Sequence, residues 1–224
     1  MTKTLLPAAL ALMLAAAPVA AFDVASMTET ERAAFGEAVR SYLMDNPEVI
    51  LEAVRTLEDR QQQQSVNDDL AMLEANRTAI YEDANSWVGG NPEGDITLVE
   101  FLDYRCGYCR KAYEEVEELV KSDNNIRFVI KEFPILGEGS LLSSKFAIAT
   151  RMLAGDDAYK RAHDALITLR GDATAESLGA LADQLGLDRT AVQAKMETPE
   201  VAQIIAANHA LADIMQINGT PSFV

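Results

Sequence analysis

The sequence contains few of the residues from which metal centres and disulfide scaffolds are built. Its 224 residues include two cysteines and two histidines. A structural zinc site usually takes four Cys or His ligands, and the four in this chain are scattered from Cys106 to His209. Two cysteines form at most one bridge, which excludes a disulfide-stabilised scaffold. The sequence also lacks a glycine-rich phosphate loop, a Ser-His-Asp order and a flavin motif, so neither a metal nor a cofactor is implied.

Positive charge is scarce as well. The chain has 19 Lys and Arg against 35 Asp and Glu, a net charge of −16. A nucleic-acid-binding protein needs a basic surface that neutralises phosphates, so nucleic acid is excluded as a partner. Apolar residues make up 49% of the chain, which is enough for a hydrophobic core. The length indicates one domain with an appendage, or two small domains.

The first 21 residues have the pattern of a secretory signal peptide. Lys3 precedes an apolar run from Leu5 to Ala17, and the small residues up to Ala21 fit a cleavage site before Phe22. The run is shorter than the roughly 20 residues that span a membrane. We therefore expect an exported protein whose cysteines meet an oxidising environment.

Residues 22–86 are predicted to be helical. Thr28 begins a capping box with Glu31, and apolar residues then recur with a helical period. A second helix begins near Pro47 and extends toward Ile80. A helix pair of this length without its own core must bury its apolar stripe against something, so we expect the segment to self-associate. The alternative is a solvated helical stalk.

Residues 87–224 are predicted to form an α/β domain, and the Gly-Gly-Asn-Pro stretch at 89–92 marks its start. A β-α-β unit with parallel strands and a right-handed crossover is indicated by a strand at 96–103, a helix at 112–120 and a strand at 126–133. Helical signals then continue through an insertion at about 138–218, and a further strand begins after Pro221.

Cys106 and Cys109 form a C-x-x-C pair between the first predicted strand and its helix. At a first helical turn, Cys106 faces unpaired backbone N–H groups and the positive end of the helix dipole, which lower a thiol pKa from about 8.5. Cys109, one turn further along, is more shielded and suits the resolution of a mixed disulfide. A purely structural disulfide across so short a loop constrains little of the unfolded chain. The pair therefore predicts redox chemistry.

The run from Phe101 to Cys109, the helical block after Phe133 and the late Thr220-Pro221 resemble the DsbA-type branch of the thioredoxin superfamily. The resemblance implies a thioredoxin fold with a helical insertion. It also implies that the bond before Pro221 is cis, lies against the active-site disulfide and presents the Thr220 backbone to substrate. Without it, an ordinary strand-leading proline is the alternative. Because this family continues with a further strand and a closing helix, we expect both to be missing here.

The same resemblance assigns roles to Glu100 and Lys131. Glu100 lies six residues before Cys106, where DsbA-type enzymes carry a buried glutamate, and Lys131 occupies the place of the lysine that accompanies it. Glu100 also alternates with apolar residues on one strand face, a setting that raises a carboxyl pKa. Such a group beneath Cys109 would take and return the proton of the resolving thiol. The alternative is that Glu100 pairs with Lys131 only for burial.

The residues between the cysteines separate subclasses of the family. Strong oxidases typically have Pro-His there, whereas Gly107-Tyr108 and a Thr before the cis proline resemble the periplasmic disulfide isomerases, and these residues would contact substrate. Residues 42–50 are similar to the N-terminal oligomerisation region of suppressor-of-copper-sensitivity C proteins. The resemblance implies a periplasmic isomerase of exported proteins, with a membrane redox partner and a homo-oligomeric state. The alternatives are a net dithiol oxidase and a copper(I)-binding protein, since two thiolates suit Cu(I).

Overall fold

The computed structural model describes residues 26–224, so the predicted signal peptide lies outside the described residues. The chain divides into two compact units, and the division falls between Gln63 and Gln64. Within residues 26–224, no helix combines the length and the apolar character that a membrane crossing requires.

The first unit contains α1 (Glu29–Asp45) and the beginning of α2 (Glu48–Ala75), whose remainder lies in the second unit. The predicted capping box starts α1: the Thr28 hydroxyl accepts from the Glu31 N–H, and the Glu31 carboxylate accepts from the Thr28 N–H. In these two described helices no side chain is buried. The part of them in this unit exposes Phe35, Val39, Tyr42, Met44, Ile50, Leu51, Val54 and Leu57.

The second unit is built on a sheet of four strands, β1 (Trp87–Gly90), β2 (Ile96–Leu102), β3 (Ile126–Glu132) and β4 (Ser222–Phe223). Their spatial order is β1-β3-β2-β4. The central strands β2 and β3 are parallel, while β1 and β4 pair antiparallel at the two edges. The helix α4 (Gly107–Asp123) joins β2 to β3 and ends at Asn124, which has a left-handed φ of 58°. The predicted β-α-β unit is therefore confirmed.

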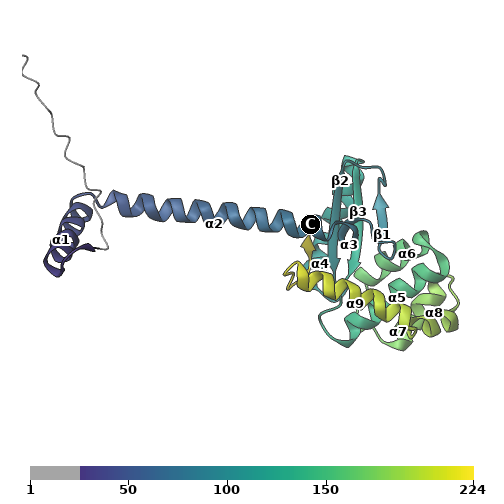
Figure 1. Cartoon of the computed structure of the whole chain (residues 1–224). Coiled ribbons are helices and arrows are strands. Elements are labelled where there is room, and N and C mark those ends of the chain that lie inside the picture. The colour runs from purple at the N-terminus through teal and green to yellow at the C-terminus, as the bar shows by residue number, and fades with distance from the viewer. Residues whose placement is uncertain (1–25) are drawn as a thin grey trace, which may run out of the picture. The chain divides into compact units, whose positions relative to one another are not determined.

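Five helices lie between β3 and β4: α5 (Glu138–Ala154), α6 (Asp156–Ile167), α7 (Ala175–Gln184), α8 (Arg189–Met196) and α9 (Pro199–Ile214). Figure 1 shows them gathered as one group at the sheet. α5 is the centre of this group because it packs against each of the other four. The predicted mixed α/β architecture, with helices between the β-α-β unit and the last strand, is confirmed.

The sheet has two covered faces. The α4 face, which carries Leu102 and Phe128, shares a core with α4 and the helices α5–α9. The opposite face carries Val99 and clusters with Ile80 of α3 (Arg77–Tyr81) and Leu211 of α9, and we call it the α3 face. Because Ile80 is fully buried there, the segment between Gln63 and β1 belongs to the same compact unit as the sheet.

Candidate functional site

Cys106 and Cys109 lie at the beginning of α4. Cys106 is the N-cap residue, with an extended backbone (φ −72°, ψ 120°), and Cys109 lies in the first turn. Cys106 is 7% exposed and Cys109 is fully buried, and both are free thiols. The Cys106 thiol donates to the Thr220 carbonyl oxygen, with an Sγ to O distance of 3.1 Å. The cysteine pair thus meets the segment that leads into β4.

The two thiols differ in acidity. Burial alone would raise the pKa of Cys106, but hydrogen bonds from the Thr220 side chain and from the N–H groups of Cys109 and Tyr108 lower it below its usual value. Burial raises the pKa of Cys109 to about 12, and the nearby Cys106 adds to this increase. N–H groups at a helix N-terminus favour a thiolate. Cys106 is therefore the more acidic thiol of the pair, and Cys109 is the less acidic one.

The bond between Thr220 and Pro221 is cis, as predicted from the family resemblance. Both residues line a shallow groove of about 460 Å³ with Tyr108, Lys111, Ala112 and Glu115 of α4. Tyr108 is 72% exposed, and the Lys111 Nζ lies 5.4 Å from the centre of its ring. Gly107 is also exposed. Three of the four predicted substrate-binding residues, Tyr108, Thr220 and Pro221, thus line one groove, and the fourth, Gly107, is exposed next to Cys106 in the chain.

Glu100 is buried on the α4 face of the sheet, with 4% of its surface exposed. Burial raises the pKa of Glu100 to about 8, and the negative charges of Glu117 and Glu132 act in the same direction. The apolar setting and the raised pKa expected from the sequence are both present. A carboxyl with this pKa exchanges its proton near neutral pH.

Lys131 does not accompany Glu100. In the parallel register Glu100 is opposite Ile130, so Lys131, one residue further along β3, points to the α3 face. There its Nζ lies 2.7 Å from the Ala79 carbonyl oxygen and 3.0 Å from the Asp83 carboxylate, and the side chain is 1% exposed. The expectation that Lys131 accompanies Glu100 is therefore wrong, and so is the alternative that the two pair for burial, because strand alternation places them on different faces. Lys131 holds the α3 segment to the sheet.

Glu132 is a second buried carboxyl, which was not predicted from the sequence. It is 3% exposed, and its Oε1 accepts from the hydroxyls of Tyr104 (2.8 Å) and Tyr159 (2.6 Å). Burial raises the pKa of Glu132 to about 7 although these hydrogen bonds oppose the change. The Tyr104 hydroxyl also lies 3.2 Å from the Nδ1 of His163, whose pKa burial lowers to about 4. The available signal for Glu132 was a carboxyl at an inward position of an otherwise apolar strand.

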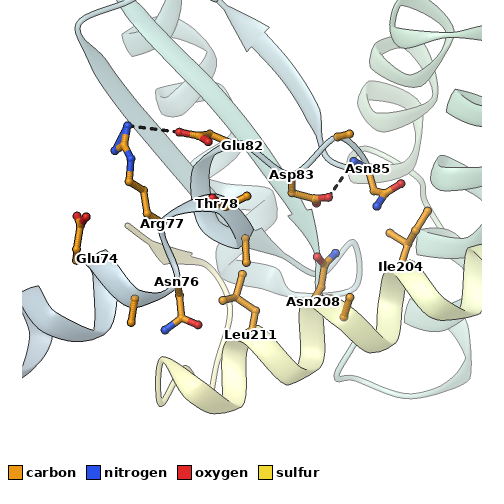
Figure 2. A pocket seen from close by; sticks show the side chains of 14 residues that line it. Glu74, Asn76, Arg77, Thr78, Glu82, Asp83, Asn85, Ile204, Asn208 and Leu211 are labelled. Atoms are coloured by element: carbon orange, nitrogen blue, oxygen red, sulfur yellow. Dashed lines mark hydrogen bonds and ion pairs between the residues drawn. The ribbon is translucent and has the colours of Figure 1, made fainter.

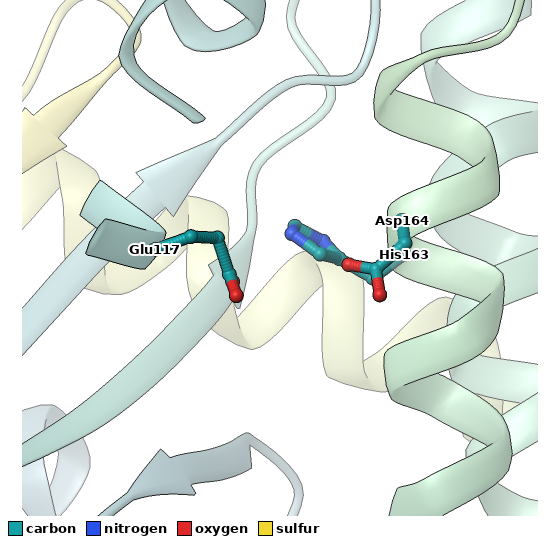
Figure 3. A group of neighbouring side chains, drawn as sticks. All are labelled: Glu117, His163 and Asp164. Atoms are coloured by element: carbon teal, nitrogen blue, oxygen red, sulfur yellow. The ribbon is translucent and has the colours of Figure 1, made fainter. Parts of the chain in front are cut away.

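A group of side chains with metal-ligand chemistry lies between α4 and α6 (Figure 3). One ligand atom from each of Glu117, His163 and Asp164 lies within 4.8 Å of the others. Lys160 already pairs with both carboxylates, since its Nζ lies 3.1 Å from Glu117 and 2.6 Å from Asp164. The Tyr113 hydroxyl also donates to Asp164. The Lys160 ammonium therefore supplies the positive charge between these carboxylates. The side chains form a salt-bridge cluster that joins α4 and α6.

A cavity of about 720 Å³ lies on the α3 side of the second unit (Figure 2). It is lined by the last residues of α2, by α3 and the turn after it, and by α9. Arg77 and Glu82 form an ion pair at its wall, and Asp83, the partner of Lys131, also lines it. The cysteines and Glu100 do not line this cavity, so it is separate from the dithiol site.

The sheet order, the dithiol at the start of α4 and the cis proline beside it define a thioredoxin-like protein. The family model of the DSBA-like thioredoxin domain matches residues 97–224, and the chain belongs to this family. The family model of the copper resistance protein ScsC N-terminal domain matches residues 31–64. The predicted thioredoxin fold and the DsbA-type resemblance are thereby confirmed.

Solved structures and curated proteins include further relatives. A thioredoxin-like oxidoreductase from Silicibacter pomeroyi DSS-3 is 46% identical, covering 66% of this chain and 84% of that one, with a TM-score of 0.62. A linker-deletion mutant of Proteus mirabilis ScsC shares the fold at 22% identity, covering 90% of this chain and 88% of that one, with a TM-score of 0.62. The Na(+)/H(+) antiporter NhaA 1 of Salinispora arenicola is 31% identical over 137 residues, or 61% of this chain. The chain spans about a fifth (21%) of the length of the curated relatives it matches.

Proposed function

We propose that this chain is a periplasmic thiol:disulfide oxidoreductase that rearranges the disulfide bonds of exported proteins. The observation that carries the proposal is the contrast between an acidic Cys106 beside the groove and a fully buried Cys109 with a raised pKa. The family match and the 46% identity to a thioredoxin-like oxidoreductase support the activity. A solved relative from Salmonella, 25% identical and described as a periplasmic thioredoxin-like protein, supports the location.

Exchange begins when the Cys106 thiolate attacks one sulfur of a substrate disulfide. A bond forms between Cys106 and the substrate, the substrate disulfide breaks, and its second sulfur leaves as a thiolate that takes a proton. In isomerisation this substrate thiol gives up its proton again, its thiolate attacks another substrate disulfide, and a substrate thiolate finally displaces Cys106, so no net electrons are transferred. In release, Cys109 loses its proton and attacks the Cys106 sulfur. The enzyme is then oxidised to a disulfide, and the substrate leaves with two more electrons.

Glu100 takes the proton of Cys109 during release and returns it when the enzyme disulfide is reduced. Its burial on the α4 face and its pKa of about 8 support this role. Thr220 and Pro221 hold the substrate strand, because the Thr220 carbonyl lies 3.1 Å from the attacking sulfur. A membrane redox partner keeps the pair reduced, as the isomerase reaction requires a free Cys106 thiolate.

Isomerisation is favoured over net oxidation by the residues around Cys106. Gly107 and Tyr108 supply no cationic side chain to the thiolate. Of the two histidines, His163 is buried on α6 and His209 packs on Phe133, with ring centres 4.7 Å apart. A thiolate with fewer stabilising charges makes a weaker oxidant, and the enzyme tolerates its reduced state.

The proposal is tested on ribonuclease A in two forms. The reduced protein should restore activity to scrambled, fully oxidised ribonuclease faster than the oxidised protein reactivates reduced ribonuclease, and Cys106→Ala should lose both activities. A preference for the reduced substrate would instead identify a net oxidase. Tight, stoichiometric Cu(I) binding without either activity would identify a copper-binding protein.

We also propose that the N-terminal segment makes the protein a homo-oligomer. Its helices expose eight apolar side chains, from Phe35 to Leu57, and an apolar stripe of this kind stabilises a helix only when something covers it. Light scattering of the exported protein should give a multiple of the monomer mass, and deletion of residues 22–62 should reduce it to a monomer. A monomer mass that the deletion does not change would refute this part of the proposal.

A further inference from the structure

A cluster of buried hydrogen-bonding groups lies on the α4 face of the sheet. Glu132, the last residue of β3, accepts at Oε1 from Tyr104 (2.8 Å) and Tyr159 (2.6 Å). Tyr104 in turn contacts His163 at 3.2 Å. All four side chains are at most 3% exposed. The inserted helix α6, which carries Tyr159 and His163, therefore fixes one carboxyl oxygen of Glu132 in position.

The other carboxyl oxygen of Glu132 is less firmly held. Oε2 is buried and makes no hydrogen bond of normal geometry, although the Ser144 hydroxyl of α5 also acts to stabilise the charged carboxylate. A buried charged oxygen without a donor costs free energy, and binding a proton removes that cost. The charge of Glu132 therefore depends on pH in the neutral range, in keeping with its pKa of about 7.

Glu132 and Glu100 share one face of the sheet. In the register of β2 and β3, Glu100 is opposite Ile130 and Glu132 is opposite Leu102, so the two carboxyls occupy diagonal inward positions. Strands about 4.8 Å apart with a rise of about 3.3 Å per residue place the backbones at such positions roughly 8 Å apart. Two negative charges at this distance in a buried site repel each other appreciably. Burial raises the pKa of Glu100, and the negative charges of Glu117 and then of Glu132 add to this increase.

The surrounding elements also contribute charged and titratable groups. These are Glu117 of α4, paired with Lys160 of α6, Asp103 and Tyr104 in the loop after β2, Tyr159, His163 and Asp164 of α6, and Arg151 of α5, which acts on Tyr159. Burial keeps His163 neutral and raises the pKa of both tyrosines far above its usual value. Among the groups with a resolved pKa change, Glu132 is the neighbour of Glu100 that ionises near neutral pH.

We propose that Glu132 is a positioning residue of the exchange reaction, whose negative charge keeps Glu100 protonated and so delays the attack of Cys109 on the mixed disulfide. The inference rests on the proposed function, in which Glu100 receives the Cys109 proton. As the pH rises, Glu132 loses its proton near pH 7 and Glu100 near pH 8. A Glu100 that still holds a proton cannot accept another, so the substrate remains bound to Cys106 long enough to rearrange.

Glu132→Gln tests the inference, because glutamine removes the charge and keeps an oxygen that accepts from both tyrosines. The titration of Glu100 is followed by ¹³C NMR of carboxyl-labelled glutamate in the reduced protein. The pH profile of release is followed as glutathione leaving its mixed disulfide with Cys106 in quenched flow. We expect both midpoints to fall by about one pH unit and release at pH 7 to become faster.

Glu118→Gln is the matched control, since it removes a negative charge from an exposed position of α4 and should move neither midpoint. In a Glu100→Gln background, Glu132→Gln should leave the release profile unchanged. An unmoved Glu100 titration, or a shift that persists in that background, overturns the inference. If Glu100→Gln alone leaves the release profile unchanged, Glu100 does not receive the Cys109 proton. That result refutes the proposed role of Glu100, and the inference about Glu132 with it, and it differs from the two results that overturn the inference alone.

Should Glu132→Gln fail to fold, Tyr159→Phe replaces it. This substitution removes one of the two hydroxyl donors to Oε1 of Glu132, so Glu132 carries less charge at neutral pH. Both midpoints should then fall by less than in Glu132→Gln. A Glu100 titration that Tyr159→Phe leaves unmoved or shifts to higher pH contradicts the inference.

Discussion

Replacing Cys106 with serine is expected to reduce the rate of thiol–disulfide exchange by a factor on the order of 1000 or more. Cys106 is the thiol whose pKa is lowered by hydrogen bonds from Thr220 and from the first turn of α4. Cys109 cannot take over the attack, because it is fully buried and its pKa is raised to about 12. The rate is measured as the reduction of insulin disulfides, with the thermal unfolding curve of Cys106→Ser as the control for folding.

The same substitution separates the two thiols spectroscopically. Thiolates absorb near 240 nm, and the wild-type protein should show a transition at a pH below about 8.5 that is absent from Cys106→Ser. In Cys109→Ser the transition should remain. Equal residual exchange in the two variants would mean that either thiol can attack, contrary to the asymmetry seen in the structure.

Replacing Lys131 with alanine is expected to lower the free energy of unfolding by about 3 kcal/mol. The side chain is 1% exposed and pairs with Asp83, so its removal leaves a buried cavity and a partly buried carboxylate without its cation. Burial lowers the pKa of Lys131, while Asp83 opposes that change. Urea unfolding followed by circular dichroism measures the loss.

Lys131→Met provides the matched variant for this second prediction. Methionine keeps most of the volume and removes only the charge, so it should destabilise the protein less than alanine does. Because Lys131 lies on the α3 face, neither substitution should move the pH profile of release from Cys106, whereas Glu100→Gln should. If Lys131→Met shifts the pH profile of release as Glu100→Gln does, Lys131 acts with Glu100 in the reaction, contrary to its position on the α3 face.

The position of Glu100 was predictable from the sequence, whereas the position of Lys131 was not. Alternation within β2 is sufficient to place Glu100 on an inward face beside apolar neighbours. The face of Lys131 depends on the register between β2 and β3, and a shift of one residue would exchange the two faces. Sequence similarity assigned Lys131 the role of the family's lysine. The register of this sheet instead places its side chain on the α3 face, where it pairs with Asp83.

The dithiol was also predictable, because the C-x-x-C spacing and the strand before it are local features. Its surroundings depend on contacts between distant parts of the chain. Thr220 lies 114 residues after Cys106, and only the family resemblance predicted that the two are in contact. Neither a local pattern nor the family resemblance predicted the cluster around Glu132. Its Tyr104 and Tyr159 come from different elements that meet only when α6 packs against the sheet.

The most direct test of the account is the identity of the cysteine that holds the substrate. Cys109→Ala is incubated with scrambled ribonuclease, free thiols are alkylated, and disulfide-linked peptides are identified by mass spectrometry without reduction. If Cys106 is the attacking thiol, mixed disulfides accumulate and Cys106 is the linked residue. Accumulation of substrate on Cys109 in Cys106→Ala, with none on Cys106 in Cys109→Ala, would contradict it.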